Sequence, residues 1–157
     1  MDHTNQTSLE AEKTFPDKVA LREALRDTDP DVRRRAARAL DHLPLDDETV
    51  RVLVDLIRVE RIPEVRGAAV HVLACVGCKT ETCSIKFDIV GLLIDVLMND
   101  PSAEVRRQTI GGLQAADDQP RVQKAIRAAL NDPSKKVRGK VAYILPLKER
   151  RAIRGLP

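Results

Sequence analysis

Four residues near the middle of the chain have side chains that bind transition metals. His71, Cys75, Cys78 and Cys83 form the pattern His-x3-Cys-x2-Cys-x4-Cys. On one helix the first three would lie within about 60° of one another, and zinc accepts nitrogen and sulfur ligands in a tetrahedral site. Gly77 is expected to end the helix before Cys78 and so to separate these ligands. We therefore favour unliganded thiols over a metal site or a Cys78–Cys83 disulfide or redox pair, and expect no cofactor.

Other residue types that do chemistry are not spaced as a catalytic site requires. Histidines occur only at positions 3, 42 and 71, and no serine or cysteine lies in a sequence that would activate it as a nucleophile. Gly111-Gly112 follows no expected strand and lacks the Lys-Ser/Thr of a phosphate-binding loop. The sequence therefore predicts a protein that is not an enzyme.

Positively charged and polar residues indicate binding instead. They recur two to six residues after Val32, Val65, Val105 and Val137, and the predicted binding surface consists of Arg34, Arg35, Arg38, His71, Arg107, Gln108, Lys140 and Tyr143. A row of this kind suits an acidic protein segment or the phosphates of a nucleic acid. Because Tyr143 is its one aromatic residue, base stacking and sequence-specific recognition of nucleic acid are not expected.

The charge is distributed unevenly along the chain. The 157 residues have a net charge of +3, and residues 130–157 contain eight lysines and arginines against two acidic residues. No apolar run approaches the roughly 20 residues that span a bilayer, so no contact with a membrane is expected. Three closely spaced cysteines and a polar beginning of the chain predict a cytoplasmic location.

The residues described above must be positioned by a repeated unit. Asp-Pro followed by Val-Arg occurs at 29–33, 100–106 and 132–138, with a shorter version at 63–66, and the Val-Arg steps lie 33, 40 and 32 residues apart. Self-similarity at such a period is typical of a solenoid. Apolar residues at three- and four-residue intervals on both sides of each Asp-Pro indicate two helices per unit, an A helix and a B helix. The sequence thus predicts an all-α superhelix of about four helix pairs.

The expected boundaries follow from this pattern. A repeat domain over residues 15–146 contains units at about 16–43, 46–77, 87–116 and 118–146. Residues 1–14 are predicted to be a disordered tail, and residues 147–157 a basic tail or a short capping helix. The longer interval between the second and third units predicts a projecting loop around residues 78–85. Gly111-Gly112 inside a helical pattern is expected to mark close packing.

The units resemble HEAT repeats, in particular the bacterial phycobilisome lyase-like type. Residues 17–43 match the pattern best, with Leu21, Leu25, Asp27, Asp29-Pro30, Val32-Arg33, Ala36 and Ala39-Leu40 in register. The second unit departs from it, since Glu60-Arg61-Ile62-Pro63 stands where the Asp-Pro turn should be. The resemblance implies a structural ladder of hydrogen bonds in which Arg33, Arg66, Arg106 and Arg138 pair with Asp27, Asp100 and Asp132.

The function that this resemblance favours is that of a non-catalytic adaptor or scaffold. The B-helix surface would bind another protein, and an acidic segment would suit its positive charge. Two alternatives remain open. One is a non-specific nucleic-acid-binding protein that uses the basic surface, and the other is a lyase-like or metal-dependent accessory protein.

Overall fold

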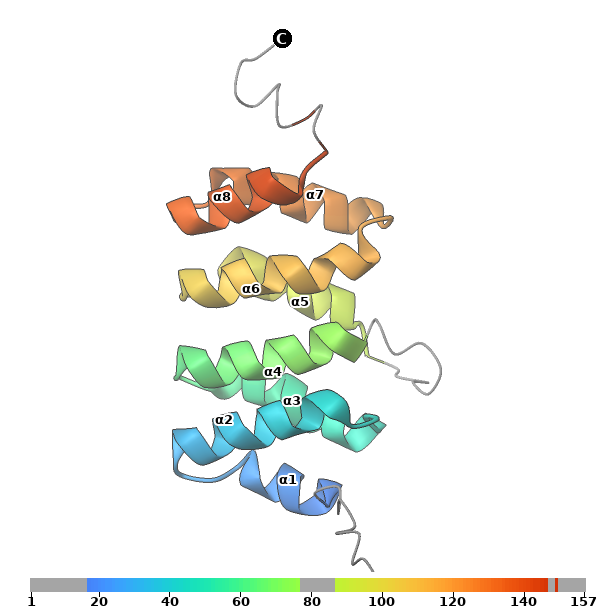
Figure 1. Cartoon of the computed structure of the whole chain (residues 1–157), viewed down its shortest axis with the longest axis vertical. Helices are drawn as coiled ribbons and strands as arrows, with labels where there is room; N and C mark the ends of the chain where they lie inside the picture. Colours follow the sequence, from blue (N-terminus) through green and yellow to red (C-terminus); the bar gives the residue numbers. More distant parts are fainter. Residues whose placement is uncertain (1–16, 77–86, 147–148, 150–157) are drawn as a thin grey trace, which may run out of the picture.

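A computed structural model of the chain describes residues 17–76, 87–146 and 149. Within these ranges the chain forms eight α-helices, arranged as four pairs stacked along one axis (Figure 1). The helices are α1 (Lys18–Ala24), α2 (Pro30–Ala39), α3 (Asp47–Val59), α4 (Pro63–Val76), α5 (Ile89–Asn99), α6 (Ala103–Leu113), α7 (Pro120–Ala128) and α8 (Lys135–Ile144). The predicted all-α solenoid is confirmed.

Helix starts are defined by side chains that cap the first turn. Asp29 accepts a hydrogen bond from the Asp31 amide at 2.8 Å, and Pro30 then occupies the first position of α2, where its missing N–H is not needed. Asp46 caps α3 in the same way through the Thr49 amide, also at 2.8 Å. Asp29-Pro30 therefore starts its helix as its residue types predict. The helices α6 and α8 instead begin two residues after Asp100-Pro101 and Asp132-Pro133, with Ser102 and Ser134 at their N-caps.

The B helices α2, α4, α6 and α8 form one layer in which each packs against the next, and they lie nearer the viewer in Figure 1. Three of the four repeated valines, Val65, Val105 and Val137, are almost completely buried inside this layer, whereas Val32 is partly buried. The A helices form the second layer, where α1 packs against α3 and α5 against α7. Between α3 and α5 lie two clefts of about 340 and 350 Å³.

The two adjacent glycines of α6 have different surroundings. A Cβ atom added to Gly112 would collide with the Cβ of Ala74 on α4, so the absence of a side chain lets α4 and α6 approach closely. A Cβ atom on Gly111 would meet no other atom of the described residues within 4 Å. Close packing therefore accounts for Gly112 and not for Gly111.

Three of the expectations fall on other parts of the chain. The predicted tail at 1–14, the loop around residues 78–85 and the C-terminal tail or capping helix at 147–157 lie outside the described residues, apart from Glu149. In the part of the chain that the structure describes, no helix has both the length and the apolar character needed to cross a membrane.

Candidate interaction groove on the B helices

A groove with a volume of about 810 Å³ crosses α2, α4 and α6 on the B-helix layer. We call it the B groove. Its lining consists of Arg34, Arg38, Asp41, Glu64, Gly67, Ala68, His71, Ala74, Gln108, Gly111, Gly112 and Ala115. Four residues of the predicted binding surface, Arg34, Arg38, His71 and Gln108, are thus brought together on one concave surface.

The floor of the B groove is made of the smallest residues. Glycine and alanine contribute six of its twelve lining residues, three of them from α4 and the others from α6 and the turn that follows it. Gln108 lies across Gly67, because a Cβ atom at Gly67 would be only 2.6 Å from the Gln108 side-chain oxygen. Beside this amide the floor at Gly111 stays open. The small residues therefore give the groove its depth.

The two arginines at the α2 side of the groove differ in their partners. Arg34 contacts Asp31, one turn earlier on the same helix, at 3.1 Å. Arg38 is exposed and has no acidic partner among the residues that the structure describes. Since Asp41 and Glu64 also line the groove, its charge is mixed rather than uniformly positive. Arg38 is the cation that is available to a ligand.

His71 is held by a carboxylate within the groove. Its Nε2 lies 3.2 Å from Asp41 Oδ2, and the two side chains come from α4 and from the 3-10 turn that follows α2. The His71 side chain remains 62% exposed, whereas that of Asp41 is 21% exposed. This contact spans two repeats and fixes one wall of the groove.

The other four residues of the predicted surface do not line the groove. Arg107 makes two hydrogen bonds to Glu104, at 2.6 and 3.0 Å, and this contact lowers the pKa of Glu104. On α8, Lys140 Nζ lies 5.8 Å from the centre of the Tyr143 ring, and Tyr143 is 71% exposed. Arg35 is an exposed residue of α2 outside the groove. The predicted continuous row is thus divided into a groove and separate flanking positions.

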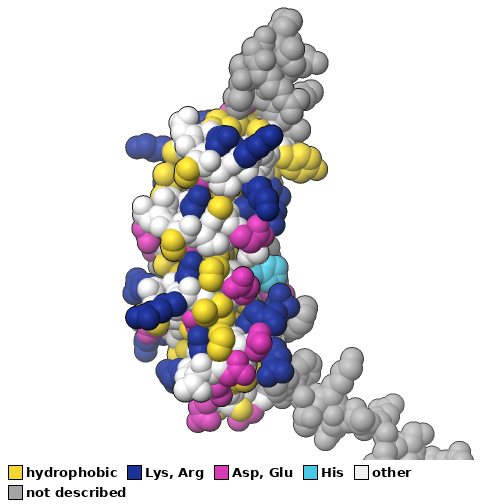
Figure 2. Space-filling view, turned by 90° about the vertical axis from the view of Figure 1, so that its left-hand side faces the viewer, with side chains coloured by type: hydrophobic (Ala, Val, Ile, Leu, Met, Phe, Trp, Pro, Cys, Tyr) yellow, Lys and Arg dark blue, Asp and Glu magenta, His cyan; other side chains and the backbone are white. Residues whose placement is uncertain are grey.

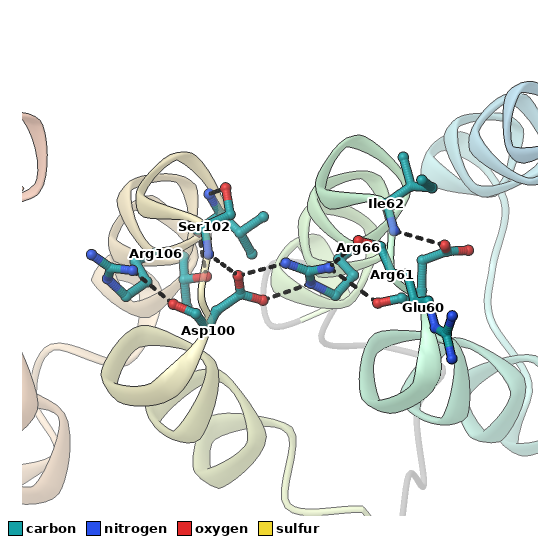
Figure 3. Close-up of polar contacts among 9 residues, drawn as sticks. Glu60, Arg61, Ile62, Arg66, Asp100, Ser102 and Arg106 are labelled. Atoms are coloured by element: carbon teal, nitrogen blue, oxygen red, sulfur yellow. Dashed lines mark hydrogen bonds and ion pairs between the residues drawn. The ribbon is translucent and has the colours of Figure 1, made fainter.

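Arginines also connect the repeats at the edge where each A helix turns into its B helix. Arg66 donates from Nε and Nη2 to the two carboxylate oxygens of Asp100, both at 2.8 Å, and from Nη1 to the backbone carbonyls of Glu60 and Arg61 at 3.0 Å (Figure 3). Asp100 in turn accepts a hydrogen bond from the Ser102 amide at 2.7 Å. One guanidinium therefore joins its own turn to the turn of the following repeat.

Arg106 repeats this arrangement one unit later. It donates to both oxygens of Asp132 at 2.8 and 2.9 Å and to the Asp100 carbonyl at 2.7 Å. At the last repeat, Arg138 donates to the carbonyls of Asp132 and Pro133 at 2.7 and 2.9 Å. No acidic side chain of a later repeat contacts Arg138 within the described ranges.

The first arginine of the ladder has a different partner from the one that the resemblance implied. Arg33 contacts the Asp27 backbone carbonyl at 2.7 Å, while its Nε donates to the Glu60 carboxylate at 2.6 Å. The Asp27 carboxylate instead accepts a hydrogen bond from the Asp29 amide at 2.8 Å. Because Glu60 also accepts from the Ile62 amide at 2.8 Å, it performs the role of the missing aspartate in the second repeat. The sequence indicated a difference at this place, because Glu60-Arg61-Ile62-Pro63 stands where the other repeats have an Asp-Pro turn.

The same edge carries a second hollow that the sequence pattern did not indicate. Figure 2 views the edge with the A-to-B turns, where hydrophobic side chains lie between charges of both signs. A cleft of about 640 Å³ lies there between the ends of α1 and α3. Its lining includes Val59, which is 75% exposed, and Ile62, which is 38% exposed. Such a cleft depends on how two helix ends meet, which periodicity does not specify.

The candidate metal ligands are divided by the limits of the described chain. Cys78 and Cys83 lie outside the described residues, as does the side chain of Cys75. His71, the remaining member of the cluster, contacts Asp41. Among the described side chains no group of three or more metal-binding residues occurs.

The protein is an α-solenoid: its helix pairs are stacked, valines of three B helices are buried between them, and arginines connect one repeat to the next. A family model of HEAT repeats matches residues 18–82 and 90–154, which together are more than half of the chain. The protein therefore belongs to the HEAT-repeat family. No curated protein matches the chain by sequence. HEAT repeats generally act as scaffolds for protein interactions.

Proposed function

We propose that the protein is a non-catalytic adaptor that binds another protein through the B groove. The observation that carries this proposal is a groove of about 810 Å³ with an open floor of small residues and an exposed arginine at one side. HEAT-family membership supports the same role. The groove crosses three helices, so a bound segment would contact two or more repeats at once. Its affinity would therefore depend on how these repeats are placed relative to one another.

The chemistry of the groove supports a partner with an acidic segment. Arg38 forms no ion pair with any described residue, so a carboxylate of the partner would form charge-assisted hydrogen bonds without displacing an existing one. Asp41 also lines the groove, where its carboxylate contacts His71. Glu64 is the remaining acid in the groove, and its position favours a second, neutral or basic contact farther along the same segment.

The experiment compares two neighbouring arginines of α2. Proteins from the native host are purified with the wild-type protein, with Arg38→Glu and with Arg35→Glu, and are quantified by mass spectrometry. A partner of the B groove is lost with Arg38→Glu and retained with Arg35→Glu, because both residues are exposed but only Arg38 lines the groove. The partner is then purified and its dissociation constant measured by calorimetry for all three proteins. If no protein separates the two variants, the proposal is wrong.

Non-specific binding of nucleic acid is the second candidate. Six cations of the B helices form no ion pair within the described chain. One of them, Arg138, donates to two backbone carbonyls, and the other five are Arg35, Arg38, Lys135, Lys136 and Lys140. They would supply contacts to phosphates, but they come from the first and last B helices and are not accompanied by stacking aromatic side chains in the groove. The lyase-like alternative has no comparable observation behind it.

A further inference from the structure

Gly111 occupies a position that calls for an explanation. It lies within α6, and glycine is the least favourable residue for a helix interior apart from proline. Close packing explains Gly112, whose missing side chain admits Ala74. At Gly111 no described atom lies within 4 Å of the place a Cβ would occupy, so packing within this chain does not require glycine there.

Gly111 is exposed and lines the B groove, and the space beside it is open. We call this open space the hollow; the lining of the same groove also includes Ala74, Gly112 and Ala115 and the polar residues His71 and Gln108. Small apolar residues together with a few polar groups suit one aliphatic side chain. A larger residue at position 111 would fill it.

The groove offers a second, chemically different contact at its other end. Arg38 lies on α2, and Gly111 lies on α6, with α4 between them. Neighbouring packed helices are about 8–10 Å apart, so the two contacts are separated by about 16–20 Å. Five or six residues of extended chain cover that distance at about 3.3 Å each, and about twelve residues cover it as a helix at 1.5 Å each.

We infer that the segment bound in the B groove places a carboxylate on Arg38 and an aliphatic side chain in the hollow over Gly111. This inference rests on the proposed function and specifies the partner. The carboxylate gains the one cation of the groove that has no acidic partner among the described residues. The aliphatic side chain buries apolar surface against alanine and glycine of the groove.

The test uses a phage library of random peptides of twelve residues, a length that spans both contacts in either conformation. Peptides are selected on the wild-type protein, and their dissociation constants are measured on three variants, Gly111→Leu, Gly139→Leu and Arg38→Glu. Gly139 is a matched control, because it is a helical glycine of α8 with equally open surroundings and lies outside the groove. Both changes replace a helical glycine by a better helix former, so loss of folding is not expected in either.

We expect the selected peptides to share an acidic and an aliphatic position, and Gly111→Leu to weaken their binding at least tenfold while Gly139→Leu leaves it unchanged. Changing the aliphatic residue of a peptide to glycine should weaken binding to the wild type and have little further effect on Gly111→Leu, as a coupled pair does. Peptides that lose affinity with Arg38→Glu but bind Gly111→Leu normally would overturn the inference and leave the groove function intact. Peptides that are indifferent to both changes would contradict the groove function itself.

Discussion

Individual arginines determine how one repeat is attached to the next. The side chains of Arg66 and Asp100 are 7% and 5% exposed, and those of Arg106 and Asp132 are 10% and 7% exposed. Arg66 donates to two backbone carbonyls of its own turn and Arg106 to one, and each also donates to a carboxylate one repeat later. Removing one partner would leave a charge in a buried place without compensation, which costs more than losing an exposed ion pair.

Arg66→Met should therefore destabilise the protein by about 3–5 kcal/mol in urea unfolding followed by circular dichroism. Arg121→Met provides the comparison, because Arg121 also makes two hydrogen bonds to a carboxylate, that of Asp88, but both side chains are about half exposed. Its unfolding midpoint should hardly change. Replacing both Arg66 and Asp100 by apolar residues should restore part of the lost stability. Equal losses for Arg66→Met and Arg121→Met would show that the ladder adds nothing through its burial.

The same contacts make stability depend on pH in the acid range. Hydrogen bonds from Arg106 and then from the Ser134 amide lower the pKa of Asp132 below its ordinary value of 3.8, although burial opposes the shift. The unfolded chain then binds this proton at a higher pH than the folded chain does. The contribution of Asp132 to the free energy of unfolding is therefore fully present above about pH 5 and is lost as the pH falls below about 4. In Asp132→Asn the protein should be less stable at pH 7 and lose less stability between pH 5 and 3. A parallel pH profile for both proteins would contradict this assignment.

At the scale of elements, α4 and α6 form the most extensive contact between neighbouring repeats. Gly112→Ala introduces a Cβ that collides with Ala74, so the helices must separate, and we expect a loss of about 1–3 kcal/mol in the free energy of unfolding. Gly139→Ala adds the same atom to α8 at an open position and should stabilise the protein by up to about 1 kcal/mol. Thermal unfolding of the two variants measures both effects. A gain in stability for Gly112→Ala would show that the contact adapts without cost.

The helices and their order could be predicted because their signals are local. Asp29-Pro30 caps α2 and Val65 lies in the core for reasons that a few neighbouring residues already contain. The role of Glu60 could not be predicted in this way, since it depends on Arg33 approaching from the previous repeat. Likewise, the spacing that placed Arg38 and Arg107 on one surface could not show that Glu104 binds Arg107 while Arg38 stays available. Sequence periodicity gives the side of a helix on which a residue lies, whereas its partner depends on tertiary packing.

For the molecule as a whole, the net charge of +3 does not show how many cations of the B layer an anion could contact, because several of them are already paired. Arg66 and Arg106 are used inside the ladder, and Arg34 and Arg107 contact acids of their own helices. Arg138 donates to backbone carbonyls of its own turn, and the remaining cations of the B helices without an ion pair in the described chain are Arg35, Arg38, Lys135, Lys136 and Lys140. They lie on α2 and α8, at opposite ends of the stack in Figure 1.

This distribution predicts weak binding of nucleic acid that depends steeply on salt. Five contacts to phosphate would give a slope of about −4.5 for the logarithm of the binding constant against that of salt concentration, hence a loss of several hundredfold between about 50 and 200 mM. Fluorescence anisotropy with a labelled duplex and a labelled single strand at both concentrations measures this, and no sequence preference should appear. A protein partner in the B groove should remain bound at the higher salt concentration, because buried apolar contacts are not screened. Submicromolar binding of either nucleic acid at 200 mM, abolished by Arg35→Glu with Arg38→Glu, would make nucleic acid the favoured ligand and the adaptor proposal wrong.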